Sequence, residues 1–377
     1  MPYFREGLLA VACRKAAEAI EMCSTHYGLF ASAGKDGYTS VWGRDSMVSL
    51  TGASFHTKKF KAVFGNSLKT LAKYQTKLGQ IPNAVDLYDN SRQKQVTFAT
   101  IDSGLWFVIG EYFYRKHFGK SLWRKHHKNI EAAMRWVSYQ DSGNDLMPEQ
   151  LPTSDWQDCF PHKYGHTINT QALYYAALSA TGNRKILPKL KKQIDKYLFD
   201  SYLGYYLPWH WKDHNEYKEK EEWFDSLGNM LAIVFGLADS KQQDSILDFV
   251  EEHNVAKPFP VKAIHPPIQK DDREWKDYFT ASDAGEPGSY LNGGIWPYIG
   301  GFYVAALVEA KRFDDAEKNL ELLAKANKIE NQEEWGFSEW IHPARKTGEG
   351  SHHQAWSAGC FLLAYECVKR KKNLLRF

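Results

Sequence analysis

The chain has 377 residues, 43% hydrophobic and 25% charged, which is ordinary for a globular protein and excludes a disordered or fibrous one. Its 48 basic and 45 acidic residues leave a net charge of +3, too balanced for a dedicated nucleic-acid or membrane-surface binder. Five cysteines without a Cys-x-x-Cys pair predict reduced thiols and a cytoplasmic location. The sequence predicts neither a signal peptide nor a membrane span.

Apolar residues recur at steps of three and four along most of the chain, a period that predicts an all-α protein. The predicted helices, in chain order, are 4–24, 46–55, 58–77, 103–118, 121–139, 167–181, 183–199, 226–238, 241–253, 293–310, 312–327 and 353–369. They form six pairs with short internal links, and alternate helices begin at intervals of roughly 60 residues. Six such hairpins can close into an (α/α)6 toroid of inner and outer helices. An open solenoid or a two-lobed bundle is the alternative. Because no Pro/Gly/Ser-rich linker divides the chain, a single domain over 1–377 is predicted.

Tryptophan is concentrated in the loops that precede the predicted inner helices, and Asp, Asn and Arg accompany it there. In a closed ring these loops meet at one end and form a cleft. Aromatic faces stack on sugar rings, while carboxylates and Arg bind hydroxyls, so the cleft suits a carbohydrate. Asp45, Asp102, Asp225 and Asn292 each precede a predicted helix, so helix capping is a second interpretation of each.

Carboxylates in two of these loops are candidates for glycosidic bond cleavage. The reaction needs one protonated and one ionised carboxyl group, which inverting enzymes place about 6.5–9.5 Å apart. Asp155 and Asp158 lie in the third loop and Glu339 in the sixth, and a six-fold ring puts these loops opposite each other. His162 and His166 have no evident third metal ligand, and no phosphate loop or dinucleotide fingerprint is present.

Several segments between about residues 36 and 368 resemble the clan of six-hairpin glycosidases. The alkaline/neutral invertase family is the most similar, and the glucosidase domain of glycogen-debranching enzymes is a near second. The resemblance rests on the order of short motifs, namely Trp42-Gly43-Arg44-Asp45, Asp102-Ser103-x-Leu105-Trp106, Tyr164-Gly165-His166, Tyr290-x-Asn292-x-Gly294-x-Trp296-Pro297 and Gln354-x-Trp356-x-Ala358-Gly359.

The resemblance implies an (α/α)6 barrel and an inverting hydrolase without cofactor or metal. It implies Glu339 as general base and an Asp of the third loop as general acid. Counting back from Tyr164 indicates Asp158, whereas Asp-Trp-x-Asp loops elsewhere in the clan indicate Asp155, which is favoured. The implied substrate-binding residues are Arg44, Asp45 and Asp102 for the nonreducing-end sugar, Trp42, Trp296 and Trp356 as walls, and Trp156, Tyr290, Asn292 and Gln354 beside them.

The expected function is therefore exo-acting hydrolysis of an α-glucosidic bond in sucrose or a short α-glucan, with no nucleic-acid or membrane partner. Phe337-Ser338-Glu339-Trp340 departs from the invertase pattern Trp-Pro-Glu-Tyr-Tyr, so sucrose specificity stays open. The alternatives are amylo-α-1,6-glucosidase-like debranching, a phosphorylase and a non-catalytic sugar-binding barrel. An isomerase or epimerase that uses His166, His210 or His353 is a further one.

Overall fold

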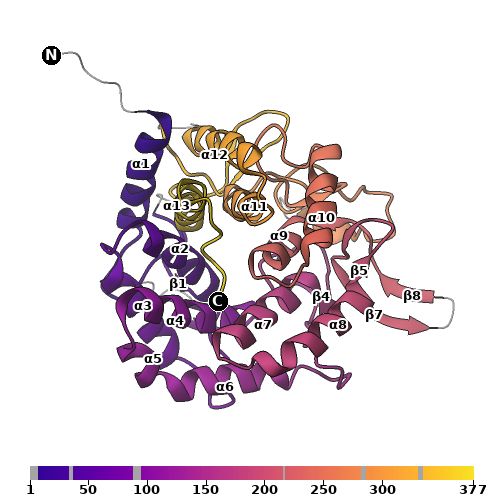
Figure 1. Ribbon diagram of the computed structural model, residues 1–377, viewed down its shortest axis with the longest axis horizontal. Coiled ribbons are helices and arrows are strands. Elements are labelled where there is room, and N and C mark those ends of the chain that lie inside the picture. Colours follow the sequence, from indigo (N-terminus) through magenta and orange to yellow (C-terminus); the bar gives the residue numbers. More distant parts are fainter. Residues whose placement is uncertain (1–6, 34–36, 88–94, 215–216, 282–285, 330–333) are drawn as a thin grey trace.

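The computed structural model describes residues 7–33, 37–87, 95–214, 217–281, 286–329 and 334–377. The helices form an inner layer around the centre of the molecule and an outer layer around it (Figure 1). The inner helices are α2 (Gly43–His56), α4 (Asp102–Phe118), α7 (Ile168–Ala180), α9 (Ser226–Val234), α11 (Pro297–Glu309) and α13 (Ala355–Arg370). Each inner helix packs against the next in this order, and α13 returns to α2, so the ring is closed. This confirms the predicted all-α (α/α)6 toroid and excludes the open solenoid.

The outer layer consists of α1 (Leu8–Met22), α3 (Lys61–Lys73), α5 (Ser121–Lys125), α6 (His127–Ser138), α8 (Leu187–Leu198), α10 (Ser240–Glu252) and α12 (Phe313–Lys328), with the short 3₁₀ helices η1 (Arg184–Ile186) and η2 (Asp277–Ala281). The outer helices expose one face, whereas the inner helices bury nearly every residue because neighbours surround them. The predicted helix 121–139 is divided at His126, whose Nδ1 lies 2.6 Å from Glu111 Oε1 of α4. The predicted helix 293–310 begins only at Pro297, because Gly293 turns the chain with φ +98°.

The inner helices α2 and α13 pack closely against each other. A Cβ added to Gly52 would lie 2.2 Å from the Gly359 carbonyl oxygen, and one added to Gly359 would lie 2.4 Å from the carbonyl oxygen of Ser49. Both glycines are therefore required where the last inner helix closes on the first.

Short antiparallel strands fasten the loops at the inner-helix N-termini. They are β1 (Val41–Trp42), β2 (Ala84–Val85) and β3 (Val96–Thr97) in one sheet; β4 (His166–Thr167), β7 (Trp209–His214) and β8 (Tyr217–Lys220) in a second; and the pairs β5 (Phe199–Asp200) with β6 (Tyr205–Tyr206), β9 (Phe224–Asp225) with β10 (Ile264–His265), and β11 (Trp340–Ile341) with β12 (Gly348–Glu349). In the register, Trp42 pairs with Ala84 and Trp340 with Glu349. Strands thus fix the backbone immediately before α2 and directly after Glu339.

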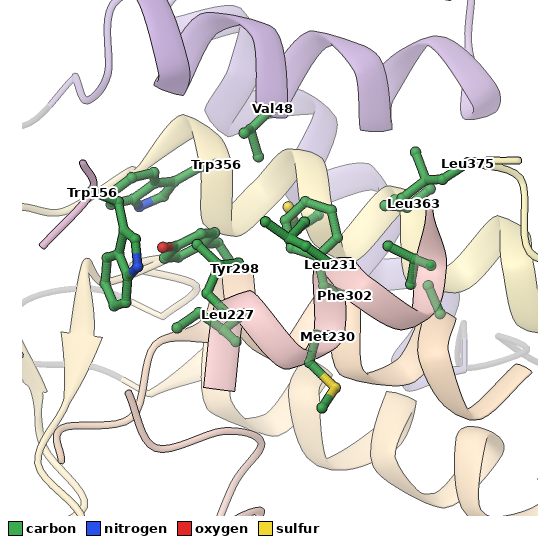
Figure 2. Close-up of a cluster of buried hydrophobic side chains, with 14 of the residues drawn as sticks. Val48, Trp156, Leu227, Met230, Leu231, Tyr298, Phe302, Trp356, Leu363 and Leu375 are labelled. Carbon is green, nitrogen blue, oxygen red and sulfur yellow. The ribbon is translucent and has the colours of Figure 1, made fainter. Parts of the chain in front are cut away.

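The core fills the inside of the inner ring and changes character along it. Figure 2 shows Trp156, Trp356 and Tyr298 grouped at one end of the buried cluster and Leu363 and Leu375 at the other. Tyr298 stacks on Trp356 at 4.3 Å with an interplanar angle of 8°. Aromatic rings therefore form the floor below the loops, and Leu363 and Leu375 lie at the opposite end.

All five cysteines are free thiols, as predicted, and four of them are buried. No helix in the described segments is long and apolar enough to cross a bilayer.

Candidate active site

A cavity of about 170 Å³ lies where the inner helices α2 and α13 begin. Its lining consists of Ala31, Tyr38, Trp42, Arg44, Asp45, Trp156, Asp158, Tyr290, Trp296, Glu339, Gln354 and Trp356. A larger groove of about 600 Å³ runs beside α6 and includes Trp136, Tyr139 and Trp211, but none of the candidate carboxylates. The smaller cavity is therefore the candidate active site.

Glu339 is held in this cavity by the segment that turns back from β12. Its backbone N–H donates to the Ser351 carbonyl oxygen at 2.9 Å, and the Ser351 N–H donates to Glu339 Oε2 at 3.0 Å. Burial raises the pKa of Glu339 to about 7, and the charges of Asp45 and Asp158 act in the same direction. The bonds donated by the Ser351 N–H and the Tyr38 hydroxyl favour the ionised form and oppose that rise. Glu339 can therefore exchange a proton near neutral pH.

Asp158 lines the same cavity from the loop between α6 and β4. Its side chain is accessible within the cavity, yet the surrounding protein displaces enough water to raise its pKa above the ordinary value. The charges of Asp102 and Asp155 add to this rise, and Arg44 opposes it. The third and sixth loops thus bring one carboxyl group each to a shared cavity, as the six-fold arrangement predicts.

Asp155, the Asp that the sequence comparison favours as acid, does not reach this cavity. It is fully buried, and its Oδ2 lies 2.9 Å from Lys163 Nζ, which also contacts Asp225 Oδ2 at 3.0 Å. Its Oδ1 accepts the Gln157 N–H at 2.9 Å. A general acid must touch the leaving group. The preference for Asp155 is therefore corrected: of the two aspartates, the structure places Asp158 at the cavity.

Arg44 and Asp45, at the start of α2, form the cavity wall beside Trp356. Arg44 Nη1 donates to Asp102 Oδ2 at 3.0 Å, and its Nε lies 3.7 Å from Asp45 Oδ2. Burial raises the pKa of Asp45 to about 6, although Arg44 opposes the rise. Asp102 is fully buried behind Arg44 and does not line the cavity, so it holds the guanidinium in place instead of meeting a ligand.

The aromatic wall contains the five rings that the sequence singles out. Trp156 packs edge-on against Trp296 at 5.3 Å, and Trp296 against Trp356 at 5.8 Å. Trp296 Nε1 donates to the Tyr290 carbonyl oxygen at 3.0 Å. Within the described part of the chain, other buried polar atoms of the lining have no hydrogen-bond partner, namely Nε1 of Trp42, Trp156 and Trp356, Nε of Arg44, Oε1 of Gln354 and Oδ2 of Asp45. These atoms leave hydrogen-bonding capacity for a polar ligand.

As for Asp102, the predicted substrate-binding role of Asn292 is corrected, because Asn292 is not a cavity residue. Its amide accepts the Ile268 N–H at 2.7 Å and donates to the Ile268 carbonyl oxygen at 2.8 Å, which fastens two loop segments together. The capping interpretation is right only for Asp225, which accepts the Gly228 N–H at 3.0 Å at the start of α9. Asp45 and Asp102 lie inside the first turns of α2 and α4 and make no capping bond.

The residue that the sequence did not indicate is Tyr38, which lines the cavity and donates to Glu339. It lies outside any recognisable motif, so only its general proximity to Trp42 could have suggested it. His166, His210 and His353 are absent from the lining, which removes the basis for an isomerase. Among the described residues no group of three His, Cys, Asp or Glu side chains is arranged to hold a metal ion.

The closed ring of helices is an (α/α)6 barrel, and it carries an aromatic, carboxylate-lined cavity at the end where the inner helices begin. Residues 216–371 match the family model described as alkaline and neutral invertase, and residues 14–142 match the one described as amylo-alpha-1,6-glucosidase. The resemblance to these families that the sequence motifs predict is confirmed.

The relatives share low sequence identity with this chain. Neutral/alkaline invertase 3, chloroplastic, of Oryza sativa subsp. japonica is 24% identical over 336 residues, which cover 72% of this chain and 53% of the relative. Probable alkaline/neutral invertase D of Arabidopsis thaliana is 31% identical over 157 residues, 40% of this chain and 28% of the relative. The chain spans about half the length of the first of these relatives.

Solved structures share the fold at low sequence identity. A GH63 mannosylglycerate hydrolase from Thermus thermophilus in complex with glucose has a TM-score of 0.70 at 15% identity, covering 93% of this chain and 99% of its own. A rhamnosidase from Klebsiella oxytoca with rhamnose bound has a TM-score of 0.62 at 16% identity, covering 96% of this chain and 64% of its own.

Proposed function

We propose that this protein is an inverting, exo-acting glycoside hydrolase that cleaves an α-glucosidic bond in a small neutral sugar such as sucrose or a short α-glucan. The observation that carries the proposal is that Asp158 and Glu339, from opposite loops of the ring, line one aromatic cavity. We further propose that residues 1–377 form one catalytic domain and act in the cytoplasm, where free thiols persist.

In the proposed reaction Asp158 is the general acid and Glu339 the general base. Asp158 donates its proton to the glycosidic oxygen as the bond from that oxygen to the anomeric carbon breaks. Glu339 removes a proton from a water molecule that attacks the same carbon from the opposite face, so the configuration inverts. The raised pKa of Asp158 favours the protonated form that an acid needs. Solvent then returns the proton from Glu339 to Asp158.

The size of the cavity supports exo action. Its volume is about 170 Å³, well below the 600 Å³ of the groove beside α6, so it suits one sugar ring better than a longer chain. Tyr298 and Trp356 stack beneath it and close the floor. A sugar ring therefore enters from the loop side, and the remainder of the substrate points outward.

The charge of the cavity favours a neutral substrate. Among the described lining residues Arg44 is the single cation, and it is already paired with Asp102, whereas Asp45, Asp158 and Glu339 are acids. A carboxylate or phosphate on the substrate would be repelled by these groups. The same repulsion disfavours a phosphorylase, in which phosphate would have to approach Glu339.

A substrate panel tests the proposal. Purified protein is incubated with sucrose, maltose, isomaltose, trehalose and glucosylglycerate, and released glucose is measured. We expect turnover of at least one of the four neutral disaccharides and little of the charged glucosylglycerate. Preference for isomaltose would favour the debranching-type alternative. Tight sugar binding by calorimetry without turnover of any sugar would favour a non-catalytic barrel and overturn the proposal.

Replacing Gly350 with Ala should misplace the proposed base. Gly350 has φ +70°, and a Cβ there would lie 2.4 Å from Glu339 Oε2. Displacement of a catalytic group by about 1 Å costs on the order of 10²-fold in rate, so we expect a loss of that size in kcat/KM. Gly182→Ala is the matched control, because Gly182 has φ +82° and nothing within 4 Å of its Cβ position. Equal activity of the two variants would contradict the proposed role of the Glu339 carboxylate.

Replacing Tyr38 with Phe should shift the pH dependence. The Tyr38 hydroxyl donates to Glu339 and lowers the pKa of that carboxyl, so its removal raises this pKa above about 7. The base must be ionised, and the acid limb of kcat/KM against pH therefore moves to higher pH. An unchanged limb, or a shift to lower pH, would contradict the assignment of this limb to Glu339.

A further inference from the structure

Three charged side chains form a buried ion triad below the loop that carries Asp158. Lys163 Nζ lies 2.9 Å from Asp155 Oδ2 and 3.0 Å from Asp225 Oδ2. The side chains of all three residues are at most 1% exposed. Neither aspartate lines the cavity, so the proposed reaction does not use the triad directly.

Stability alone is a poor explanation for such a group. Removing charges from water costs several kcal/mol per ion, and apolar side chains of similar volume often stabilise a core equally well. The buried triad is better explained by the loop that its ion pairs hold in a fixed position.

The triad fastens both ends of one segment. Asp155 and Lys163 bound the segment 155–163, and their ion pair closes it into a loop that contains Trp156 and Asp158 of the cavity. At one end, Asp155 Oδ1 accepts the Gln157 N–H at 2.9 Å, a local turn that sets the direction of the chain toward Asp158.

The triad also anchors this loop to two inner helices. Asp225 caps α9 by accepting the Gly228 N–H at 3.0 Å while its other oxygen binds Lys163. Asn169 in the first turn of α7 donates to Asp155 Oδ2 at 3.4 Å. The loop is thereby fixed to the rigid ring.

We propose that Asp155, Lys163 and Asp225 are positioning residues, which hold the Asp158 carboxyl where it can donate a proton to the leaving group. This inference rests on the proposed function. The electrostatics act in the same direction: the negative charge of Asp155 raises the pKa of Asp158, as does Asp102, against the opposing charge of Arg44.

The test compares leaving groups that need a proton with one that does not. Wild type and Asp155→Asn are assayed on the neutral disaccharide that the wild type cleaves best and on α-glucosyl fluoride, because fluoride departs with little acid assistance. We expect kcat/KM of Asp155→Asn to fall about 10–10²-fold on the disaccharide and less than about threefold on the fluoride. A general disturbance of the fold would lower both rates alike.

Glu111→Gln is the matched control. Glu111 is fully buried and bonded to His126 at 2.6 Å in the same barrel, but it is not in the loop of the proposed acid. Glu111→Gln should lower kcat/KM on both substrates by a similar factor, or leave both unchanged. If Asp155→Asn does not fold, Lys163→Arg is assayed in its place, because arginine keeps the positive charge and changes the geometry of the ion pair. We expect the same selective loss of kcat/KM on the disaccharide.

Equal losses on both substrates, or no loss on either, would overturn the positioning role. Failure of the wild type on both substrates would instead overturn the proposed function, so the two failures are distinguishable.

Discussion

Replacing Glu339 with Gln should lower kcat/KM on neutral disaccharides by about 10²–10⁴-fold, the usual contribution of a general base. The amide keeps the shape of the side chain but cannot take a proton from water. The expected loss lies in kcat more than in KM, because the water is activated only in the transition state. Initial rates over a range of disaccharide concentrations measure both constants.

The same variant should fold at least as well as the wild type at pH 8. Burial raises the pKa of Glu339 to about 7, above its value in an unfolded chain, so the ionised form destabilises the folded state above that pH. An uncharged amide removes this cost, and the thermal midpoint should be equal or higher. Glu349→Gln is the control, since Glu349 lies on β12 opposite Trp340 and outside the cavity lining. Near-wild-type activity of Glu339→Gln would contradict the assignment of the base.

Replacing Asp158 with Asn should lower kcat/KM on disaccharides by about 10²–10⁴-fold and on α-glucosyl fluoride by much less. Asn cannot donate a carboxyl proton, and this matters only where the leaving oxygen needs protonation. The loss on disaccharides should exceed that of Asp155→Asn, because Asp158 lines the cavity and Asp155 does not. A larger loss of kcat/KM in Asp155→Asn than in Asp158→Asn would indicate Asp155 as the general acid.

The fold was predictable because its signal is repeated. Six helix pairs at similar spacing favour a closed ring over an open solenoid or a two-lobed bundle, and the predicted ranges differ from the observed helices mainly at their ends. The break at His126 could not be predicted, because it depends on the contact with Glu111 on another helix. The helix α11 begins later than predicted because Gly293 turns the chain and Pro297 is the first helical residue. The periodicity of the apolar residues does not reveal this turn.

The loops that form the candidate site could be predicted, but the orientations of their side chains could not. Trp42, Trp296 and Trp356 line the cavity because each lies at the start of an inner helix, and Glu339 reaches it from the loop that leads to α13. The motif Asp155-Trp156-Gln157-Asp158 contains two carboxylates, and the sequence does not state which faces the cavity. The ion pair with Lys163 keeps the Asp155 carboxylate away from the cavity. Lys163 also binds Asp225 from a distant loop, so the sequence alone does not reveal this pairing. Asn292 was misassigned for a similar reason, since its partner Ile268 lies in another segment.

Proton NMR of the first product shows directly whether Asp158 and Glu339 act from opposite faces of one sugar ring. The wild type is mixed with the best neutral α-glucoside, and the anomeric signals are followed before mutarotation mixes them. We expect β-glucose to form first and α-glucose to appear only later. First formation of α-glucose would show retention and contradict this mechanism.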